Sequence, residues 1–350
     1  MRKPGFKKIG VILFLIMAVA LAGAGCAGKV PAKTEKAVIN DKIQIGITFD
    51  NFILERWLRE RDMFVYTARR LGAEVDVRNA NGDVNKQIQQ IESFIQQGKD
   101  VIVIIAADCY RLENIVNRAR AEGIKIISYD RMIQCGEADL YITVDSEMVG
   151  QEMAQVVIDR LPQGGNVVMI CGPDSDANSK AIIKGFETTL ADAEVKIVQK
   201  ISVKAWTPEF GFQAANEVLQ DYSDINAVMC GNDGLAGYVI QALSERQMAG
   251  QVVVTGQDAD LEACQRIMEG TQTMTVYKPI EDLAAQAAEF AVMMGKGEKL
   301  NIKGTMKSEE GLSIPYYGLE PIAVTAENMD QVIIKSGFHL KEDVYRNVAK

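Results

Sequence analysis

Short apolar runs that end on a polar residue alternate along this chain with segments of helical periodicity, and this alternation restricts the fold more than any other feature. Runs that are apolar at every position are buried on both faces, as in parallel sheets covered by helices. In such sheets, ligands bind just beyond the carboxyl ends of the strands. The polar residues that follow these runs are Asp50, Asp108, Asp130, Asp145, Asp174, Asn232, Asp258 and Lys278.

Helix capping is the alternative explanation for these polar residues. Asp and Asn are common N-cap residues, so capping could account for any single carboxylate or amide in the set. It does not account for Arg131, which directly follows Asp130, or for a lysine at position 278. We therefore expect part of the set to line one hydrogen-bonding cleft.

The periodicity predicts two blocks of strand–helix units. In the first block, over residues 43–130, three expected helices are each followed by glycine, a common C-terminal signal, and they span 54–71, 86–97 and 112–122. The second block starts at residue 146, and its expected strands lie near 166–171, 194–202, 225–230, 251–256 and 274–277. The pattern predicts an α/β fold with two Rossmann-like lobes, each built on a parallel sheet.

The connections between the lobes set their expected boundaries. We place crossings of the chain near Asp145, near Tyr277 and near Ser308–Ser313. This assigns residues 42–145 plus 277–308 to an N-terminal lobe and residues 146–276 plus 309–350 to a C-terminal lobe. A cleft between two such lobes is a common site for a small molecule.

The N-terminus has the pattern of a secretory signal. Four basic residues within positions 2–8 precede an apolar run over 9–21 and the small residues 22–25. We expect residues 1–25 to be a signal peptide. An uncleaved membrane anchor is the alternative, although the run is short for a transmembrane span. Cys26 follows Ala24 and Gly25 as in a bacterial lipobox, so we expect Cys26 to be lipidated and residues 26–41 to form a tether. The protein would then be attached to the outer face of the cell membrane or lie in the periplasm.

Charge and cysteine content exclude several classes of protein. Removal of the four basic leader residues leaves 34 basic and 47 acidic residues, a net charge of −13. Such acidity argues against nucleic acid or anionic lipid as the main partner. The five cysteines beyond Cys26 are odd in number and form no C-x-x-C pair, which argues against a disulfide framework or a zinc site.

Catalytic signatures are missing from the sequence. His339 is the single histidine, which disfavours Ser-His-Asp and Cys-His systems. The metalloprotease, Walker A and nucleophile-elbow motifs do not occur. The Asp-x-Asp-x-Asn stretch at 174–178 begins like a calcium loop, but Ser179 and Gly185 occupy positions where that loop needs Gly and Glu. We therefore expect a binding protein with no metal and no cofactor, and not an enzyme.

The polar strand ends suit a polyol ligand. A sugar hydroxyl both donates and accepts hydrogen bonds, so Asp, Asn and Arg side chains pair well with it. An aromatic ring can cover the apolar C–H face of a sugar. Trp206 lies in KAWTPEF, just past a strand and before a helix started by proline, and we expect it to stack on the ligand. For Trp57, a core position and a site position are equally open.

Several longer motifs carry a family resemblance. They are LERWLRERD (54–62), NANGDVNKQIQQIE (79–92), SYDRMI (128–133), VDSEMVGQ (144–151), GNDGLAG (231–237), TGQDADL (255–261), GTQTMTVYKPI (270–280) and SGFH (336–339). In these stretches, which span about residues 42–340, the chain resembles the periplasmic D-xylose-binding proteins of the ribose-binding superfamily. The resemblance implies a type I periplasmic binding fold, in which two lobes joined by a multi-strand hinge close on one monosaccharide, most often D-xylose.

The resemblance also implies the ligand contacts and the partners. The residues that the resemblance implies as sugar contacts are Arg56, Asp130, Arg131, Asn178, Trp206, Asn232, Asp258 and Lys278, with Asp50 as a further candidate. Because this chain has DANSK where the family tends to have DNNAK, the choice between Asp176 and Asn178 stays open. The implied protein is a monomer that delivers its sugar to the membrane permease of an ABC-type importer. The alternative is a sugar-sensing subunit that presents the ligand to a histidine kinase or chemoreceptor.

Overall fold

The computed structural model describes residues 42–348, which belong to one compact unit. The expectations for the signal peptide, Cys26 and the tether concern residues outside this range. Among the described helices, none combines the length and apolarity needed to cross a bilayer.

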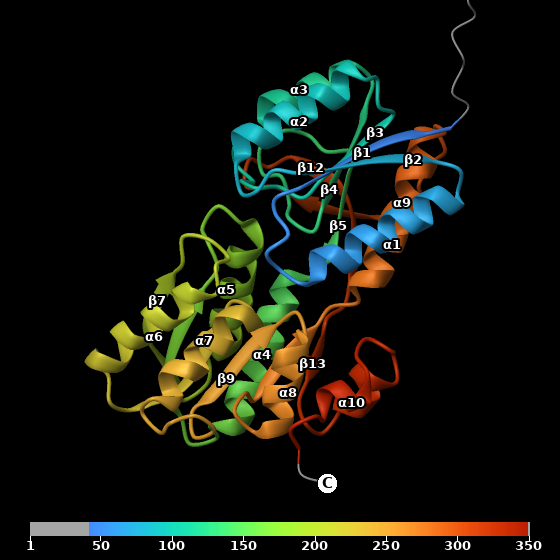
Figure 1. Ribbon diagram of the computed structural model, residues 1–350. Helices are drawn as coiled ribbons and strands as arrows, with labels where there is room; N and C mark the ends of the chain where they lie inside the picture. Colours follow the sequence, from blue (N-terminus) through green and yellow to red (C-terminus); the bar gives the residue numbers. More distant parts are fainter. Residues whose placement is uncertain (1–41, 349–350) are drawn as a thin grey trace, which may run out of the picture. The chain divides into compact units, whose positions relative to one another are not determined.

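The first lobe is built on a seven-stranded sheet with the strand order β11-β12-β5-β4-β3-β1-β2 (Figure 1). Its strands are β1 (Gln44–Phe49), β2 (Glu74–Asn79), β3 (Val101–Ile104), β4 (Lys125–Tyr129), β5 (Leu140–Val144), β11 (Gly304–Lys307) and β12 (Ser313–Leu319). Only β11 pairs antiparallel, with β12. The other neighbours are parallel, as expected for continuous apolar runs.

Helices cover both faces of this sheet, because successive strand residues point to opposite sides. Ile45 and Ile47 pack on one face with α1 (Arg56–Arg70) and α9 (Ile280–Gly295). Ile102 and Ile104 pack on the other face with α2 (Val84–Gln96) and α3 (Glu113–Ala121). Two separate apolar cores therefore hold the carboxyl ends of the strands in place.

The second lobe repeats this plan on a six-stranded sheet with the order β13-β10-β9-β8-β6-β7. Its strands are β6 (Gly165–Cys171), β7 (Val195–Ser202), β8 (Ile225–Cys230), β9 (Val253–Gln257), β10 (Met274–Tyr277) and β13 (Ile322–Val324). Helices α4 (Ser146–Arg160) and α5 (Ala177–Leu190) cover one face, and α6 (Glu209–Asp221) and α7 (Asp233–Ser244) cover the other. A further cluster joins α8 (Leu261–Glu269), the π-helical turn η1 (Asp330–Ile334) and α10 (Lys341–Val344).

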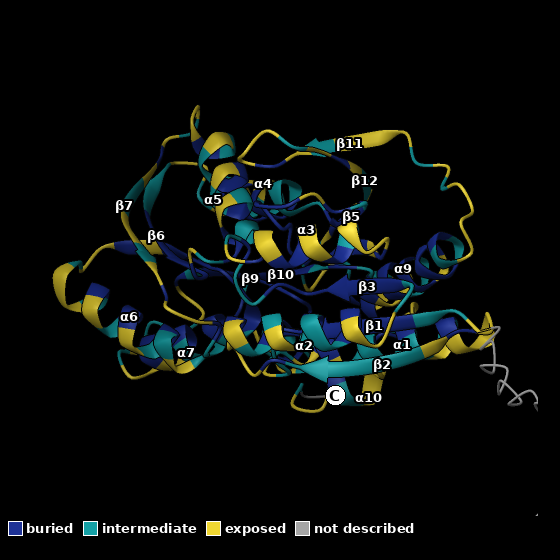
Figure 2. Cartoon of the chain, turned by 90° about the horizontal axis from the view of Figure 1, so that it is seen from above, coloured by how far each residue is buried: buried dark blue, intermediate teal, exposed yellow. Residues whose placement is uncertain are grey.

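The predicted α/β class with two parallel-sheet lobes is confirmed, and the predicted helices agree with the structure to within a few residues. Strands β2 and β11 were not predicted. Both lie at sheet edges and are partly exposed, whereas β3 is buried throughout (Figure 2). A search for continuous apolar runs misses strands of this kind.

The third connection between the lobes lies later than expected. Strand β12 pairs parallel with β5 in the first sheet, and β13 pairs antiparallel with β10 in the second, so the chain crosses between Leu319 and Ile322. Residues 313–319 thus belong to the first lobe, although we expected 309–350 in the second. Two neighbouring tyrosines favour this position, because Tyr316 packs against Tyr141 and Tyr317 against Phe290.

Candidate functional site

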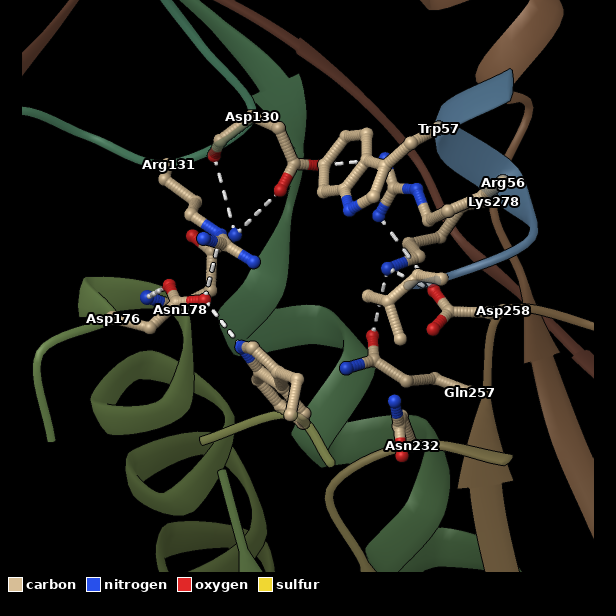
Figure 3. Close-up of a pocket in the computed structure, with 12 residues that line it drawn as sticks. Arg56, Trp57, Asp130, Arg131, Asp176, Asn178, Asn232, Gln257, Asp258 and Lys278 are labelled. Atoms are coloured by element: carbon tan, nitrogen blue, oxygen red, sulfur yellow. Dashed lines mark hydrogen bonds and ion pairs between the residues drawn. The ribbon is translucent and has the colours of Figure 1, made fainter. Parts of the chain in front are cut away.

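Strand ends from both lobes meet at one small cavity (Figure 3). Figure 3 shows the labelled side chains turned toward a common centre. The lining residues are Leu54, Arg56, Trp57, Asp130, Arg131, Asp176, Asn178, Trp206, Asn232, Gln257, Asp258 and Lys278.

The structure brings nine of the ten predicted ligand-binding residues to this cavity. They are Arg56, Asp130, Arg131, Asp176, Asn178, Trp206, Asn232, Asp258 and Lys278. Asp50 does not line it. Its buried carboxylate instead accepts a hydrogen bond from Nη1 of Arg131 at 2.7 Å, and so holds that guanidinium from behind. Gln257 and Leu54 line the cavity but were not predicted.

The remaining strand-end residues show where capping is the right explanation. Asp145 caps α4 by accepting the backbone N–H groups of Glu147 and Met148. Asp108 caps no helix but accepts the N–H of Tyr110 in the turn before α3, and neither of these carboxylates lines the cavity. Asn232 caps α7 and also lines the cavity. Capping and lining are therefore compatible, and the sequence alone does not separate them.

Arg56 is the centre of the largest charge cluster. Its Nε donates to Glu60 at 2.5 Å, its Nη2 to Asp130 at 2.6 Å, and its Nη1 lies 3.6 Å from Asp258. Arg56 and Asp130 belong to the first lobe and Asp258 to the second, so the cluster joins the lobes. Burial would lower the pKa of Arg56, but Asp130, Glu60 and Asp258 outweigh it and raise that pKa well above the usual value.

Arg131 is held in a similar way by two carboxylates. Its Nη1 donates to Asp50 at 2.7 Å and to the carbonyl of Ala106 at 3.0 Å, and its Nε lies 2.8 Å from Asp176. Burial acts to lower the pKa of Arg131, and the charges of Asp176 and Asp50 more than reverse the effect. The guanidinium is therefore a fixed, permanently charged donor.

Asp130 adopts a backbone conformation that is costly for a residue with a Cβ. Its φ is +60°, and its carbonyl accepts hydrogen bonds from the hydroxyls of Tyr141 and Thr143 at 3.1 and 2.8 Å. Asn178 of the second lobe donates to its Oδ1 at 2.9 Å. Burial tends to raise the pKa of Asp130, but Arg56, Lys278 and Arg131 lower it below the usual value. Strained backbone of this kind concentrates at functional sites.

Lys278 and Gln257 complete the wall on the second lobe. The ammonium of Lys278 lies 2.6 Å from Asp258 and donates to Oε1 of Gln257 at 3.0 Å. The amide of Gln257 in turn donates to the carbonyl of Gly231 at 2.7 Å. Gln257 is the last residue of β9, directly before Asp258, and its place at a strand end is the signal that could have identified it.

The two tryptophans both reach the cavity. Trp206 donates from Nε1 to Asp176 at 2.9 Å, and its ring lies so close to Gly172 that a Cβ there would be 2.2 Å from Cη2. Trp57 is only 1% exposed and packs in the first core, with the Arg56 guanidinium 4.4 Å from its ring centroid. Its Nε1 has no hydrogen-bond partner among the described residues. Trp57 is thus a core residue and a lining residue at once.

The charges in the cavity wall balance. Arg56, Arg131 and Lys278 supply three cations, and Asp130, Asp176 and Asp258 supply three carboxylates. Two further buried carboxylates, Asp50 and Glu60, lie behind the arginines. Such a wall offers many charge-assisted hydrogen bonds without a net positive charge, so it suits an uncharged polyhydroxylated ligand better than an anionic one.

Comparison with known proteins identifies the family of this chain. The family description for a periplasmic binding protein domain matches residues 45–299. The D-xylose-binding periplasmic protein of Haemophilus influenzae is 41% identical over 309 residues, which cover 87% of this chain and 92% of that protein. The protein of the same name from Escherichia coli is 40% identical over 317 residues, covering 89% and 95%.

Solved structures of sugar-binding proteins share the fold. One is an ABC transporter solute-binding protein from Clostridium phytofermentans with bound β-D-glucose, which has a TM-score of 0.79 at 25% identity and covers 86% of this chain and 99% of that one. Proteins of this family bind ligands and are not enzymes, and the family implies an extracytoplasmic location. The resemblance in the sequence is thus confirmed, and the chain belongs to the periplasmic sugar-binding proteins, within the family of the D-xylose-binding periplasmic proteins.

Proposed function

We propose that this protein binds D-xylose in the cavity between its lobes and delivers it to an ABC-type importer. The observation that carries the proposal is the cavity itself, whose wall combines balanced buried charges, two tryptophans and residues from both lobes. The two relatives that are 40–41% identical and carry the name D-xylose-binding periplasmic protein support the choice of sugar.

Contacts between the lobes support a single monosaccharide as the ligand. Side chains that line the cavity already contact one another across the lobes, such as Asn178 and Asp130 at 2.9 Å. A larger saccharide would have to separate these contacts. A sugar phosphate would bring charge into a wall whose cations are already paired with carboxylates, at a large desolvation cost.

The proposed mechanism is closure of the lobes on the sugar. Contacts of the sugar with both lobes add to the direct contacts between the lobes, which shifts the population toward the closed form. We assign hydroxyl contacts to Asp130, Arg131, Asn232 and Asp258, charge-assisted donors to Arg56 and Lys278, and ring stacking to Trp206. We include both Asp176 and Asn178, which line the cavity, and we assign Asp50 the support of Arg131.

Isothermal calorimetry with a panel of pentoses and hexoses tests the proposal. We expect D-xylose to bind with a Kd of about 1 μM or tighter, which corresponds to about −8 kcal/mol. L-Arabinose, D-ribose and D-glucose should bind more weakly. Folded protein that binds none of these sugars would overturn the proposed function, and tighter binding of another member of the panel would replace D-xylose by that sugar.

We also propose that Cys26 carries a lipid that holds the protein on the membrane. The support is the leader and the lipobox-like Ala24-Gly25-Cys26 sequence. Expression of Cys26→Ala in a bacterial host should move the protein from the membrane fraction to the soluble extracytoplasmic fraction, with sugar binding unchanged. A variant that stays in the membrane fraction would contradict the anchor. The structural similarity to an ABC transporter solute-binding protein supports delivery to an importer over the sensor alternative.

A further inference from the structure

The single histidine of the chain lies in a place that the sugar site does not explain. His339 follows η1 near the C-terminus and is only 6% exposed. Its Nε2 lies 2.7 Å from the carbonyl oxygen of Ala259, and its Nδ1 lies 3.3 Å from Nη2 of Arg59. A carbonyl only accepts and a guanidinium only donates, so Nε2 must carry the proton and Nδ1 must accept. The contacts therefore require the neutral ring.

Ala259, whose carbonyl contacts His339, belongs to the loop that positions Asp258. Asp258 and Ala259 have φ values of +101° and +54°, so two consecutive residues with a Cβ occupy unfavourable backbone regions. Such strain persists only where the surroundings hold it. The carbonyl of Ala259 is held by His339 at 2.7 Å, and its N–H donates to Oγ1 of Thr275 at 3.1 Å. Both polar backbone groups of Ala259 are thus fixed.

The other side of the imidazole connects to the first lobe. Arg59 lies on α1, one helical turn after Arg56. Its Nη1 donates to the carbonyl of Phe338 at 2.7 Å, and its guanidinium lies 4.5 Å from the Phe338 ring centroid. His339 thus connects two segments that both supply the cavity, the Asp258 loop of the second lobe and helix α1 of the first.

We propose that His339 is a positioning residue for sugar binding, which in its neutral form joins the Asp258 loop to α1 and on protonation releases this link and weakens binding. This inference rests on the proposed function, because it deepens the account of the same site. Protonation places a second N–H on Nδ1, where it faces the donor groups of Arg59. The result is a lost hydrogen bond and a repulsion between two cations.

The charged groups around His339 come from several segments. Arg59 faces it from α1, Glu55 from the N-cap position of α1, Glu262 from α8, and Asp260 from the loop before α8. Burial is the main cause that lowers the pKa of His339, and the positive charge of Arg59 adds to it, while Ala259, Glu55 and Glu262 oppose it. Separation of the lobes would remove Arg59 and Glu55 together and expose the ring, and burial and Arg59 outweigh Glu55, so the sugar-bound form should hold the proton less tightly than the sugar-free form.

Nuclear magnetic resonance tests this difference directly. The chain has one histidine, so protein without a histidine tag gives a single set of imidazole signals. We expect the pKa of His339 to be lower with saturating D-xylose than without it. Equal pKa values in the two states would overturn the inference, because protonation would then have no effect on binding.

Calorimetry with a matched variant gives the second test. In His339→Gln the side-chain amide can still donate to Ala259 but does not titrate, so this variant should bind D-xylose near pH 7.5 more tightly than His339→Ala. Between pH 7.5 and pH 5.0 the wild type should lose at least about threefold more affinity than this variant. A difference of half a unit between the pKa of His339 in the sugar-free and sugar-bound forms corresponds to about threefold in affinity. His339→Ala should bind more weakly at both pH values.

The outcomes separate the two proposals. If wild type binds D-xylose near pH 7.5 but the pH profiles of wild type and His339→Gln are parallel, only the inference is wrong. If wild type does not bind D-xylose at all near pH 7.5, the proposed function fails and the inference fails with it. Other titrating groups, such as Asp233, whose pKa burial raises to about 7, act equally in both proteins and cancel in the comparison.

Discussion

Replacement of Asp258 by alanine gives the sharpest test of the site, because this carboxylate joins the charges of both lobes. The side chain is 3% exposed, lies 2.6 Å from Nζ of Lys278 and 3.6 Å from Nη1 of Arg56. The substitution leaves Lys278 with the neutral Gln257 Oε1 at 3.0 Å as its remaining hydrogen-bond acceptor in the described chain. It also removes an acceptor for a sugar hydroxyl.

The expected loss follows from these contacts. A hydrogen bond to a charged group contributes about 1.5–3 kcal/mol, and a buried partner that is left unpaired costs a comparable amount. Asp258→Ala should therefore lose at least about 2 kcal/mol of binding free energy, or about 30-fold in Kd. Asp258→Asn should lose less, because the amide keeps one oxygen acceptor in the same place.

Calorimetric titration with D-xylose at fixed pH measures this loss. Asp174→Ala is the matched control, because it makes the same change at an exposed loop position of the second lobe that does not line the cavity. The control should bind like wild type. If Asp258→Ala is folded, as judged by circular dichroism, and binds D-xylose as tightly as the control, Asp258 has no place in the site and the charge argument is wrong.

Substitutions at three further positions test the wall and the residues behind it. Trp206→Phe keeps a ring but loses the hydrogen bond to Asp176, so it should weaken D-xylose binding by about tenfold. Trp206→Ala also loses the ring and should weaken binding more. Equal Kd values for the two variants would argue against stacking. Gly172→Ala puts a Cβ 2.2 Å from the Trp206 ring, and the displaced indole should alter intrinsic fluorescence and lower affinity; an unchanged emission spectrum and Kd would contradict this. Glu60→Gln removes a carboxylate from Arg56 and should lower the free energy of unfolding in urea by about 1–3 kcal/mol, whereas an unchanged value would mean that Glu60 does not help to hold Arg56.

The sequence by itself determined the class of fold and the location of most site residues. Continuous apolar strands such as β3 require cover on both faces, and carboxyl ends of parallel strands meet at one edge of a sheet. Asp130, Asp258 and Lys278 each directly follow a strand, so their place at that edge was predictable. Family motifs added residues such as Arg56 and Asn178, which lie on helices and which strand periodicity cannot find.

The tertiary structure decided which polar residues share the cavity, because that depends on contacts between distant segments. Asp145 and Asp258 both follow apolar strands, yet one only caps a helix and the other pairs with Lys278. Asp50 supports Arg131 across 81 positions of sequence, and His339 reaches Ala259 across 80. The crossing after β12 likewise depends on pairing with β5. Local sequence determines the hydrophobic periodicity of strands and helices and the residues that cap the helices. The partners of buried charges are decided by how the two lobes pack.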